Sequence, residues 1–558
     1  MRTPPDQPSP DQPSHPQPAP ASPGDPISPA GPGRALLRAG RVLVPSLAIY
    51  LLTLAVLAGI LGLDLAITGA PRHHGALVPA EVWGISAIVG CMLLYGLYAV
   101  RGPGRPRPKG LRVSRQQQPQ LWQLVEQTAR TAGVRAPHTL WLTADSELTT
   151  MQGSGLLGLF PGRLHLVVGV PLLAGLTEPQ LTALLAQRLG PARSADAPLP
   201  GLLRRNRRTL LLVLDRYTHT GNAGPGPRRW FGGMYAGYAR SCLHLTEPDS
   251  RRLLLAADRT AVRVAGRDAA SSALHREPSL AEMYHRYRDS QVLIGWEQGA
   301  FPPAAEVLPA YRDRLDSPEG RQELTELDST PPRERILRHD PRPPLPERLA
   351  RLQHLTLQSP AQSAPPTEPP PSAYLLLTDP LPTCARAVEA APGVAEKRQL
   401  PWDELAAIAG QAELDKAAEG LLASVTSVLR HRRPDLPTIL DAVDEGRWAE
   451  LADWIPRTGP ARTVPVAVGR SLNLSSAERG LHALVLAALI QQGRARWTLD
   501  RRHGRRLTPD AEVLDSVIGP ALEAAIGTPP DTAALRRLLD PDPDAPEPPP
   551  ESPPPAER

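Results

Sequence analysis

Residues 176–191 read LTEPQLTALLAQRLGP, and the interpretation of the rest of the chain depends on them. Thr177 can cap a helix, and Gln180 stands three residues later, where its side chain can reach back to the start of that helix. Apolar residues then recur at the spacing of one helix face, at Leu181, Leu184 and Leu185. The stretch therefore predicts an amphipathic helix packed on a core, which ends near Pro191 because proline has no backbone donor.

This helix resembles the zinc-binding helix of HtpX-type membrane metallopeptidases, the gluzincins that include the CAAX prenyl proteases. The resemblance begins with Gly169-Val170-Pro171-Leu172-Leu173-Ala174-Gly175-Leu176-Thr177 and continues through Ala183-Leu184-Leu185-Ala186. In that family the helix continues as H-E-L-G-H, whereas here it reads Gln187-Arg188-Leu189-Gly190-Pro191. The resemblance implies a degenerate member of the family, because only the two apolar positions of that pentapeptide match.

The three substituted positions carry the chemistry of the family. Two histidines four residues apart ligate zinc, and the glutamate beside the first acts as general base toward the metal-bound water. Gln187 and Pro191 occupy the ligand positions, and Arg188 occupies the general-base position. Arginine stays cationic, cannot accept a proton and repels a divalent metal, so we expect it to invert the electrostatics of the site.

The third zinc ligand of the family, a glutamate in E-x-x-A-D, follows an S-R-R segment. Here the segment Ser250-Arg251-Arg252 is followed by Leu254 at the glutamate position, while Asp258 is retained. We expect Leu254 to fill volume that surrounds zinc in active members. The family's later D-S-H-P-P-x-x-x-R-I appears as Asp328-Ser329-Thr330-Pro331-Pro332 with Arg335-Ile336, so Thr330 replaces its histidine.

These substitutions predict a pseudopeptidase without catalytic residues, zinc or another cofactor, which acts by binding a peptide or protein partner. One alternative is an active zinc metalloendopeptidase of the membrane with non-standard ligands, for which His244, Glu247 and His275 are candidates. Another is a different enzyme in the C-terminal region, although no phosphate-binding loop, nucleophile elbow or kinase motif is present there.

The composition limits the remaining functional classes. The net charge is +5, but lysine occurs only at Lys109, Lys397 and Lys416, and arginine carries the rest, as in proteins of GC-rich bacterial genomes. Because no aromatic-interleaved basic patch accompanies the charge, we do not expect nucleic-acid binding. Cys91, Cys242 and Cys384 are distant in sequence and odd in number, which excludes a disulfide framework.

Two uncharged runs, Val42–Leu63 and Val82–Val100, are each about 19–22 residues long, enough to span a bilayer as a helix. Arginines precede the first run and follow the second, including Arg34, Arg38, Arg41, Arg101, Arg105 and Arg107. By the positive-inside rule, both termini are cytoplasmic and the chain is a multi-pass protein of the plasma membrane.

The sequence thus predicts a mainly α (α+β) protein in six parts. A disordered proline-rich tail (1–33) precedes a two-helix transmembrane hairpin (34–109) and a degenerate metallopeptidase-like helical domain with a small sheet (110–355). A proline-rich linker (356–372) then leads to a C-terminal α+β, mainly helical domain (373–540) with a hairpin at Arg496–Leu507, and to an acidic proline-rich tail (541–558).

Overall fold

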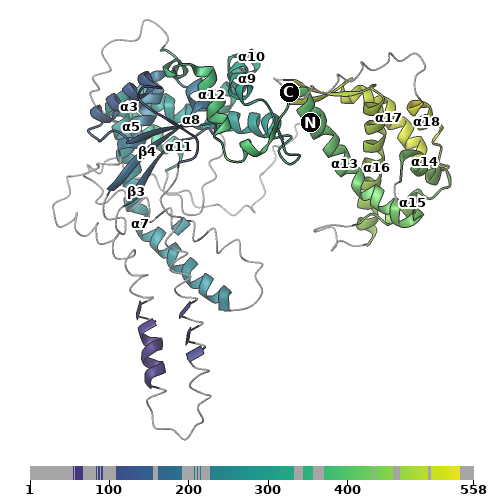
Figure 1. Cartoon of the computed structure of the whole chain (residues 1–558), viewed down its shortest axis with the longest axis horizontal. Helices are drawn as coiled ribbons and strands as arrows, with labels where there is room; N and C mark the ends of the chain where they lie inside the picture. Colours follow the sequence, from purple (N-terminus) through teal and green to yellow (C-terminus); the bar gives the residue numbers. More distant parts are fainter. Residues whose placement is uncertain are drawn as a thin grey trace, which may run out of the picture.

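The computed structural model describes residues 108–154, 161–190, 227–331, 343–355, 370–430, 434–456, 466–500 and 504–540, with short pieces between 54 and 91 and between 207 and 214. The described chain is mainly helical, as the sequence predicts, and its buried apolar residues form two large cores. Figure 1 shows the elements of the two cores as separate groups, with α13 (Trp402–Leu429) leading from one to the other.

The first core lies between a four-stranded sheet and several helices. The sheet contains β1 (Leu111–Val113), β2 (Thr139–Thr143), β4 (Pro161–Gly169) and β3 (Leu148–Ser154) in the spatial order β1-β2-β4-β3. β2 and β4 are parallel, and the outer pairs are antiparallel. β3 is therefore an edge strand next to the helix that carries the altered motif.

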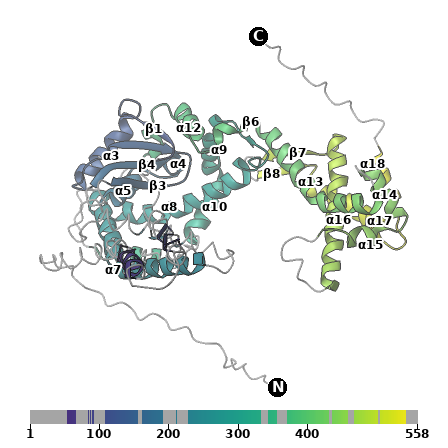
Figure 2. The same cartoon turned by 60° about the horizontal axis from the view of Figure 1, so that its bottom comes forward.

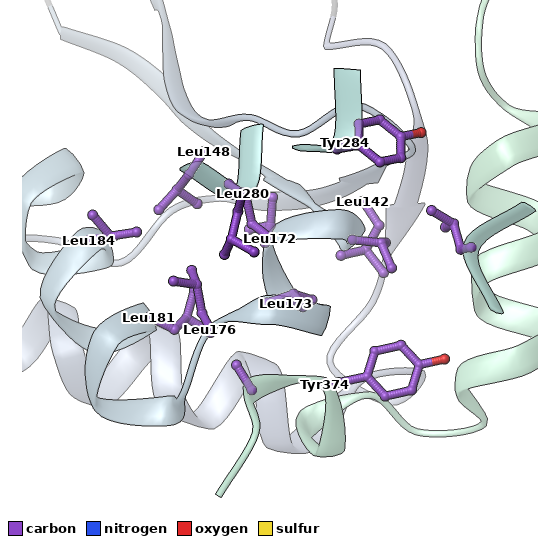
Figure 3. Close-up of a cluster of buried hydrophobic side chains, with 14 of the residues drawn as sticks. Leu142, Leu148, Leu172, Leu173, Leu176, Leu181, Leu184, Leu280, Tyr284 and Tyr374 are labelled. Carbon is purple, nitrogen blue, oxygen red and sulfur yellow. The ribbon is translucent and has the colours of Figure 1, made fainter. Parts of the chain in front are cut away.

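The helices of the first core follow the sheet in sequence, except α3, which lies between β1 and β2. They are α3 (Pro119–Thr131), α4 (Val170–Gly175), α5 (Glu178–Leu189), α7 (Pro227–Ala265), α8 (Arg267–Tyr287) with the π-helical turn η4 (Arg288–Val292), α9 (Ala304–Asp316), α10 (Pro318–Ser329), α11 (Leu345–Gln353), η6 (Ala373–Leu376) and α12 (Pro380–Glu389). In Figure 3, Leu181 of α5 lies beside Leu176, and Leu184 belongs to the same buried cluster as Leu148 of β3.

The boundary between the two cores differs from the predicted one at 372/373. Ala373, Tyr374 and Cys384 are buried in the first core. The chain after the proline-rich stretch returns to α5, where Ala373 N donates to Leu176 O at 2.9 Å and Glu178 N donates to Pro371 O at 2.9 Å. This returning segment forms the 3-10 helix η6 (Ala373–Leu376).

The second core begins within α13, around Leu414. It is formed by α13, α14 (Leu436–Asp444), α15 (Trp448–Asp453), α16 (Val466–Gln491), α17 (Ala511–Ile526) and α18 (Ala533–Leu539), together with the antiparallel hairpin of β7 (Arg496–Asp500) and β8 (Gly504–Thr508). The hairpin confirms the sequence prediction. A short parallel pair of β5 (Ala300–Phe301) and β6 (Arg398–Gln399) belongs to the segment before α13.

Within the described residues, none of the helices combines the length and the apolar composition that membrane crossing requires. Most of Val42–Leu63 and Val82–Val100 lies outside those residues. The described part of the first run is helical at 57–66, and it contacts the second run. Ser86 Oγ donates to Asp64 Oδ1 at 2.9 Å, and a Cβ placed on Gly90 would lie 3.6 Å from Leu57 Cδ2.

Candidate functional site

Helix α5 has the start and the packing that the sequence predicts. Thr177 is its N-cap, and Thr177 N donates to the Gln180 side-chain Oε1 at 3.0 Å. Leu181, Leu184 and Leu185 are buried in the first core. The helix ends at Leu189, and Gly190 follows it against α7, where an added Cβ would lie 2.8 Å from Thr260 Cβ. Glycine at this position allows α5 and α7 to approach closely, which brings the altered motif up to Asp258.

Gln187, which the resemblance places at the first histidine ligand, is hydrogen-bonded to Asp258. Gln187 Nε2 donates to Asp258 Oδ1 at 2.6 Å. Arg348 of α11 binds the same carboxylate with two nitrogens, through Nη2 to Oδ1 at 2.8 Å and Nε to Oδ2 at 3.0 Å. All three side chains are inside the protein, since the residues are between 3% and 9% exposed. The carboxylate thus accepts three hydrogen bonds, one amide and two charge-assisted.

Arg188, which the resemblance places at the general-base position, forms three side-chain hydrogen bonds. Arg188 Nη1 donates to Gln187 Oε1 at 2.9 Å, and Arg188 Nη2 contacts Glu277 Oε1 of α8 at 2.5 Å. The five side chains form one chain of contacts, in the order Glu277, Arg188, Gln187, Asp258 and Arg348, which we call the α5 polar cluster. It contains two carboxylates and two guanidinium groups. Glu277 lies against the guanidinium of Arg188 and balances its charge.

The third bond of Arg188 reaches the edge of the sheet. Glu147 O accepts from Gly169 N of β4 at 2.7 Å. Because successive carbonyls of an extended chain point to opposite sides, Leu148 O points away from β4 toward the free edge. Arg188 Nε donates to this oxygen at 2.9 Å. Arg188 therefore occupies a backbone acceptor that a peptide added to β3 would otherwise use.

The remaining predicted site residues are placed differently. Leu254 is half-buried on α7 and belongs to neither large core, so it does not fill a buried volume as expected. Thr330 is the C-cap of α10, while Arg335, Ile336 and Pro191 lie outside the described residues. Asp328, which belongs to the same late motif, forms an ion pair with Arg276.

The candidates for a replacement metal site do not come together. His244 Nδ1 lies 3.4 Å from Glu247 Oε2, and both side chains are exposed, by 85% and 50%. His275 belongs to another helix, α8, and is half-buried. Across the part of the chain that the structure describes, there is no group of three or more His, Cys, Asp or Glu side chains positioned to hold a metal ion. Cys91, Cys242 and Cys384 are all free thiols.

Sequence reasoning identified three positions of the α5 polar cluster and missed Glu277 and Arg348. Arg348 lies 90 residues after Asp258, and Glu277 lies 89 residues after Arg188. Neither has a local signal, because each sits in an ordinary amphipathic helix among other arginines and acids. Comparisons with protein-family models, with curated proteins and with solved structures found no match to the chain.

Proposed function

We propose that the chain is a membrane-anchored, non-catalytic relative of HtpX-type peptidases, which acts by binding a protein partner. The observation that carries this proposal is the α5 polar cluster. Gln187 and Arg188, at the first ligand and general-base positions of the resemblance, are hydrogen-bonded to each other. Gln187 also binds Asp258, and Arg188 binds Glu277. Arg348 of α11 binds Asp258 as well. A zinc metallopeptidase needs a group that accepts a proton from water and a metal that lowers the pKa of that water.

The contact of Arg188 with the edge of β3 supports partner binding at a surface other than this edge. An extended peptide that joins a sheet edge obtains affinity from main-chain hydrogen bonds. Arg188 already takes the Leu148 carbonyl at that edge, and Glu277 fixes the guanidinium in place. Partner binding through the second core is therefore the form of the proposal that we favour.

Membrane anchoring rests on the two apolar runs and their mutual contacts. The contacts Leu57 to Gly90 and Asp64 to Ser86 run in opposite directions along the two segments, as an antiparallel helical hairpin requires. Large apolar side chains of the first segment are exposed, namely Leu54, Leu61, Leu63 and Leu65. In lipid these side chains would be solvated by acyl chains, and the arginine-rich flanks would place both termini in the cytoplasm.

Zinc binding by the purified full chain tests the loss of catalysis. We expect the natural protein to contain no stoichiometric zinc, and to show neither chelator-sensitive proteolysis of casein nor a thermal shift with zinc. A fourfold variant, Gln187→His, Arg188→Glu, Pro191→His and Leu254→Glu, restores the ligand set. It should gain a thermal shift with zinc, because a ligand bound only by the folded state raises apparent stability.

The matched control is the threefold variant that keeps Leu254, which lacks the third ligand and should show a smaller shift. Stoichiometric zinc in the natural protein, with casein cleavage abolished by Asp258→Ala or His244→Ala, would show instead that the chain is an active metallopeptidase. Topology is tested separately by a reporter fused after Arg558. We expect signal only from the cytoplasmic form of the reporter, and an extracytoplasmic signal would refute the hairpin.

A further inference from the structure

The second core carries a groove that the proposed function does not explain. It measures about 490 Å³ and lies between α16, the β7–β8 hairpin and the start of α17. Figure 2 shows β7 and β8 at the end of this core that faces the first one. The apolar part of the groove consists of Leu486, Trp497, Leu507 and Leu514. Trp497 also packs on α13, where a Cβ at Gly410 would lie 2.3 Å from its indole nitrogen.

The polar residues of the groove are divided by sign between its two walls. The hairpin supplies Arg505 and Arg506, and the guanidinium of Arg505 lies 4.7 Å from the centre of the Trp497 ring. Arg505 already forms an ion pair with Glu413 of α13, so Arg506 is the arginine of this wall that an acidic ligand would contact. The opposite wall, at the start of α17, supplies Asp510, Glu512 and Asp515. His482 Nε2 lies 2.9 Å from Asp515 Oδ1, so this acid is already paired. An acidic ligand would therefore bind toward the hairpin and away from α17.

The C-terminal segment begins beside this groove. Helix α18 ends at Leu539, whose carbonyl accepts from Gln492 Nε2 at 2.7 Å, and Arg494 Nη1 donates to the carbonyl of Leu538. Arg494 stands three residues before Trp497, which is about 10 Å of extended chain. The end of α18 is therefore bonded to a residue close in sequence to the groove. Residues 541–558 follow directly.

The composition of this segment fits the groove. Its eighteen residues include nine prolines and five acidic residues, in the sequence PDPDAPEPPPESPPPAER. Proline-rich chains favour the polyproline II helix, and grooves lined by aromatic side chains bind such helices at a low entropic cost. At about 3.1 Å per residue, eighteen residues extend about 56 Å, which is ample to reach and cross the groove.

We propose that residues 541–558 bind in this groove of their own chain as a polyproline II segment, with prolines on Trp497 and carboxylates toward Arg506. The tether makes the binding intramolecular, with an effective concentration on the order of millimolar. Even an intrinsic Kd of about 0.1 mM would then keep the groove mostly occupied. A partner that binds this groove must displace the tail, so the tail sets a threshold for partner binding.

The test compares the full chain with a chain truncated after Asp540, both carrying the rest of the protein intact. The probe is a fluorescent peptide of residues 541–558, and its anisotropy reports binding at low ionic strength. We expect the truncated chain to bind the peptide about tenfold more tightly than the full chain, because the attached tail competes at the effective concentration given above. Equal affinity for both chains, or no binding to the truncated chain, would overturn the proposal.

Variants of the truncated chain locate the binding surface. Arg506→Glu should weaken binding several-fold, and a peptide with Glu547→Lys and Glu551→Lys should restore it by charge reversal. Trp497→Ala should weaken binding as well. The matched control is Trp454→Ala, since Trp454 is an exposed tryptophan of the same core, 62% accessible and outside the groove. An equal loss with Trp454→Ala, or no rescue of Arg506→Glu by the reversed peptide, would contradict binding at the groove.

Discussion

The two cores each contain an ion pair between distant helices, and the pairs differ mainly in burial. Arg348 Nη2 lies 2.8 Å from Asp258 Oδ1 in the first core, with side chains 10% and 4% exposed. Arg536 Nη2 lies 3.0 Å from Asp444 Oδ2 in the second, with side chains 39% and 41% exposed. Similar geometry thus occurs in two different dielectric surroundings. Removing one partner of an exposed pair costs little stability, because water can solvate the remaining charge. Removing one partner of a buried pair costs much more, because the remaining charge stays buried without a partner.

The buried pair of Arg348 and Asp258 also joins two helices of the first core. Helix α11 is short, and its contacts with α7 are largely ionic, since Arg251 Nη2 lies 2.5 Å from Glu347 Oε1 and Arg348 binds Asp258. Leu345 and Leu352 supply its buried apolar residues. The α5 polar cluster therefore links α5, α7 and α11.

The largest effect is expected from removing one member of the buried pair. Arg348→Met leaves the Asp258 carboxylate buried with Gln187 as its remaining partner in the cluster, which should cost about 3–5 kcal/mol. For a unit of this size the melting temperature should fall on the order of 10 °C, measured by circular dichroism of the full chain in detergent. The double variant Asp258→Leu/Arg348→Met should recover most of the loss, because no unpaired charge remains. A double variant as unstable as the single one would contradict this account.

An intermediate effect is expected at the rim of the same cluster. The side chains of Arg188 and Glu277 are 31% and 19% exposed, so water can partly replace a lost bond. Arg188→Met removes bonds to Glu277, Gln187 and the Leu148 carbonyl and should cost about 1–3 kcal/mol. A double-mutant cycle with Glu277→Gln should give a coupling energy of about 0.5–2 kcal/mol. Strictly additive losses would show that the two side chains do not stabilise one another.

The first core also shows how far the sequence could predict the structure. Local patterns predicted α5, its N-terminal cap and its buried leucines, because capping and helical periodicity are carried by residues close in sequence. The resemblance to HtpX-type peptidases, and not a local pattern, drew attention to Gln187, Arg188 and Asp258. The partners Arg348 and Glu277 could not be predicted, since they meet the motif only when α8 and α11 pack against α5 and α7.

Long-range packing also explains the shifted domain boundary. A proline-rich stretch suggested a domain boundary at 372, yet Ala373 and Tyr374 return to the first core through backbone bonds to the α4–α5 turn. Residues Trp402–Leu429 form the single helix α13, which runs from the first core into the second. The polar residues Glu413 and Lys416 lie on an exposed side of this helix, whose other face is buried.

The smallest effect is expected at the exposed pair of the second core. Hydrogen bonds from Thr532 and Arg536 lower the pKa of Asp444 from its usual value. Asp444→Asn keeps an acceptor for one of the two hydrogen bonds that Thr532 donates, and it loses the charge interaction with Arg536. Because both side chains are well exposed, we expect a loss of about 0.5 kcal/mol or less at pH 7. A loss near that of Arg348→Met would refute the role assigned to burial.

The pH dependence of this small loss has a defined sign. A carboxyl group with a lower pKa in the folded state binds fewer protons there than in the unfolded state, so its contribution is complete above its unfolded pKa of about 4. The contribution is lost as the pH falls from that value through the lower pKa of the folded state. The melting temperatures of the natural protein and Asp444→Asn should therefore differ by a constant amount from pH 7 to pH 5 and converge below about pH 4. A difference that grows on acidification would show that Asp444 is stabilised in its protonated form, and that the carboxylate does not contribute through Thr532 and Arg536.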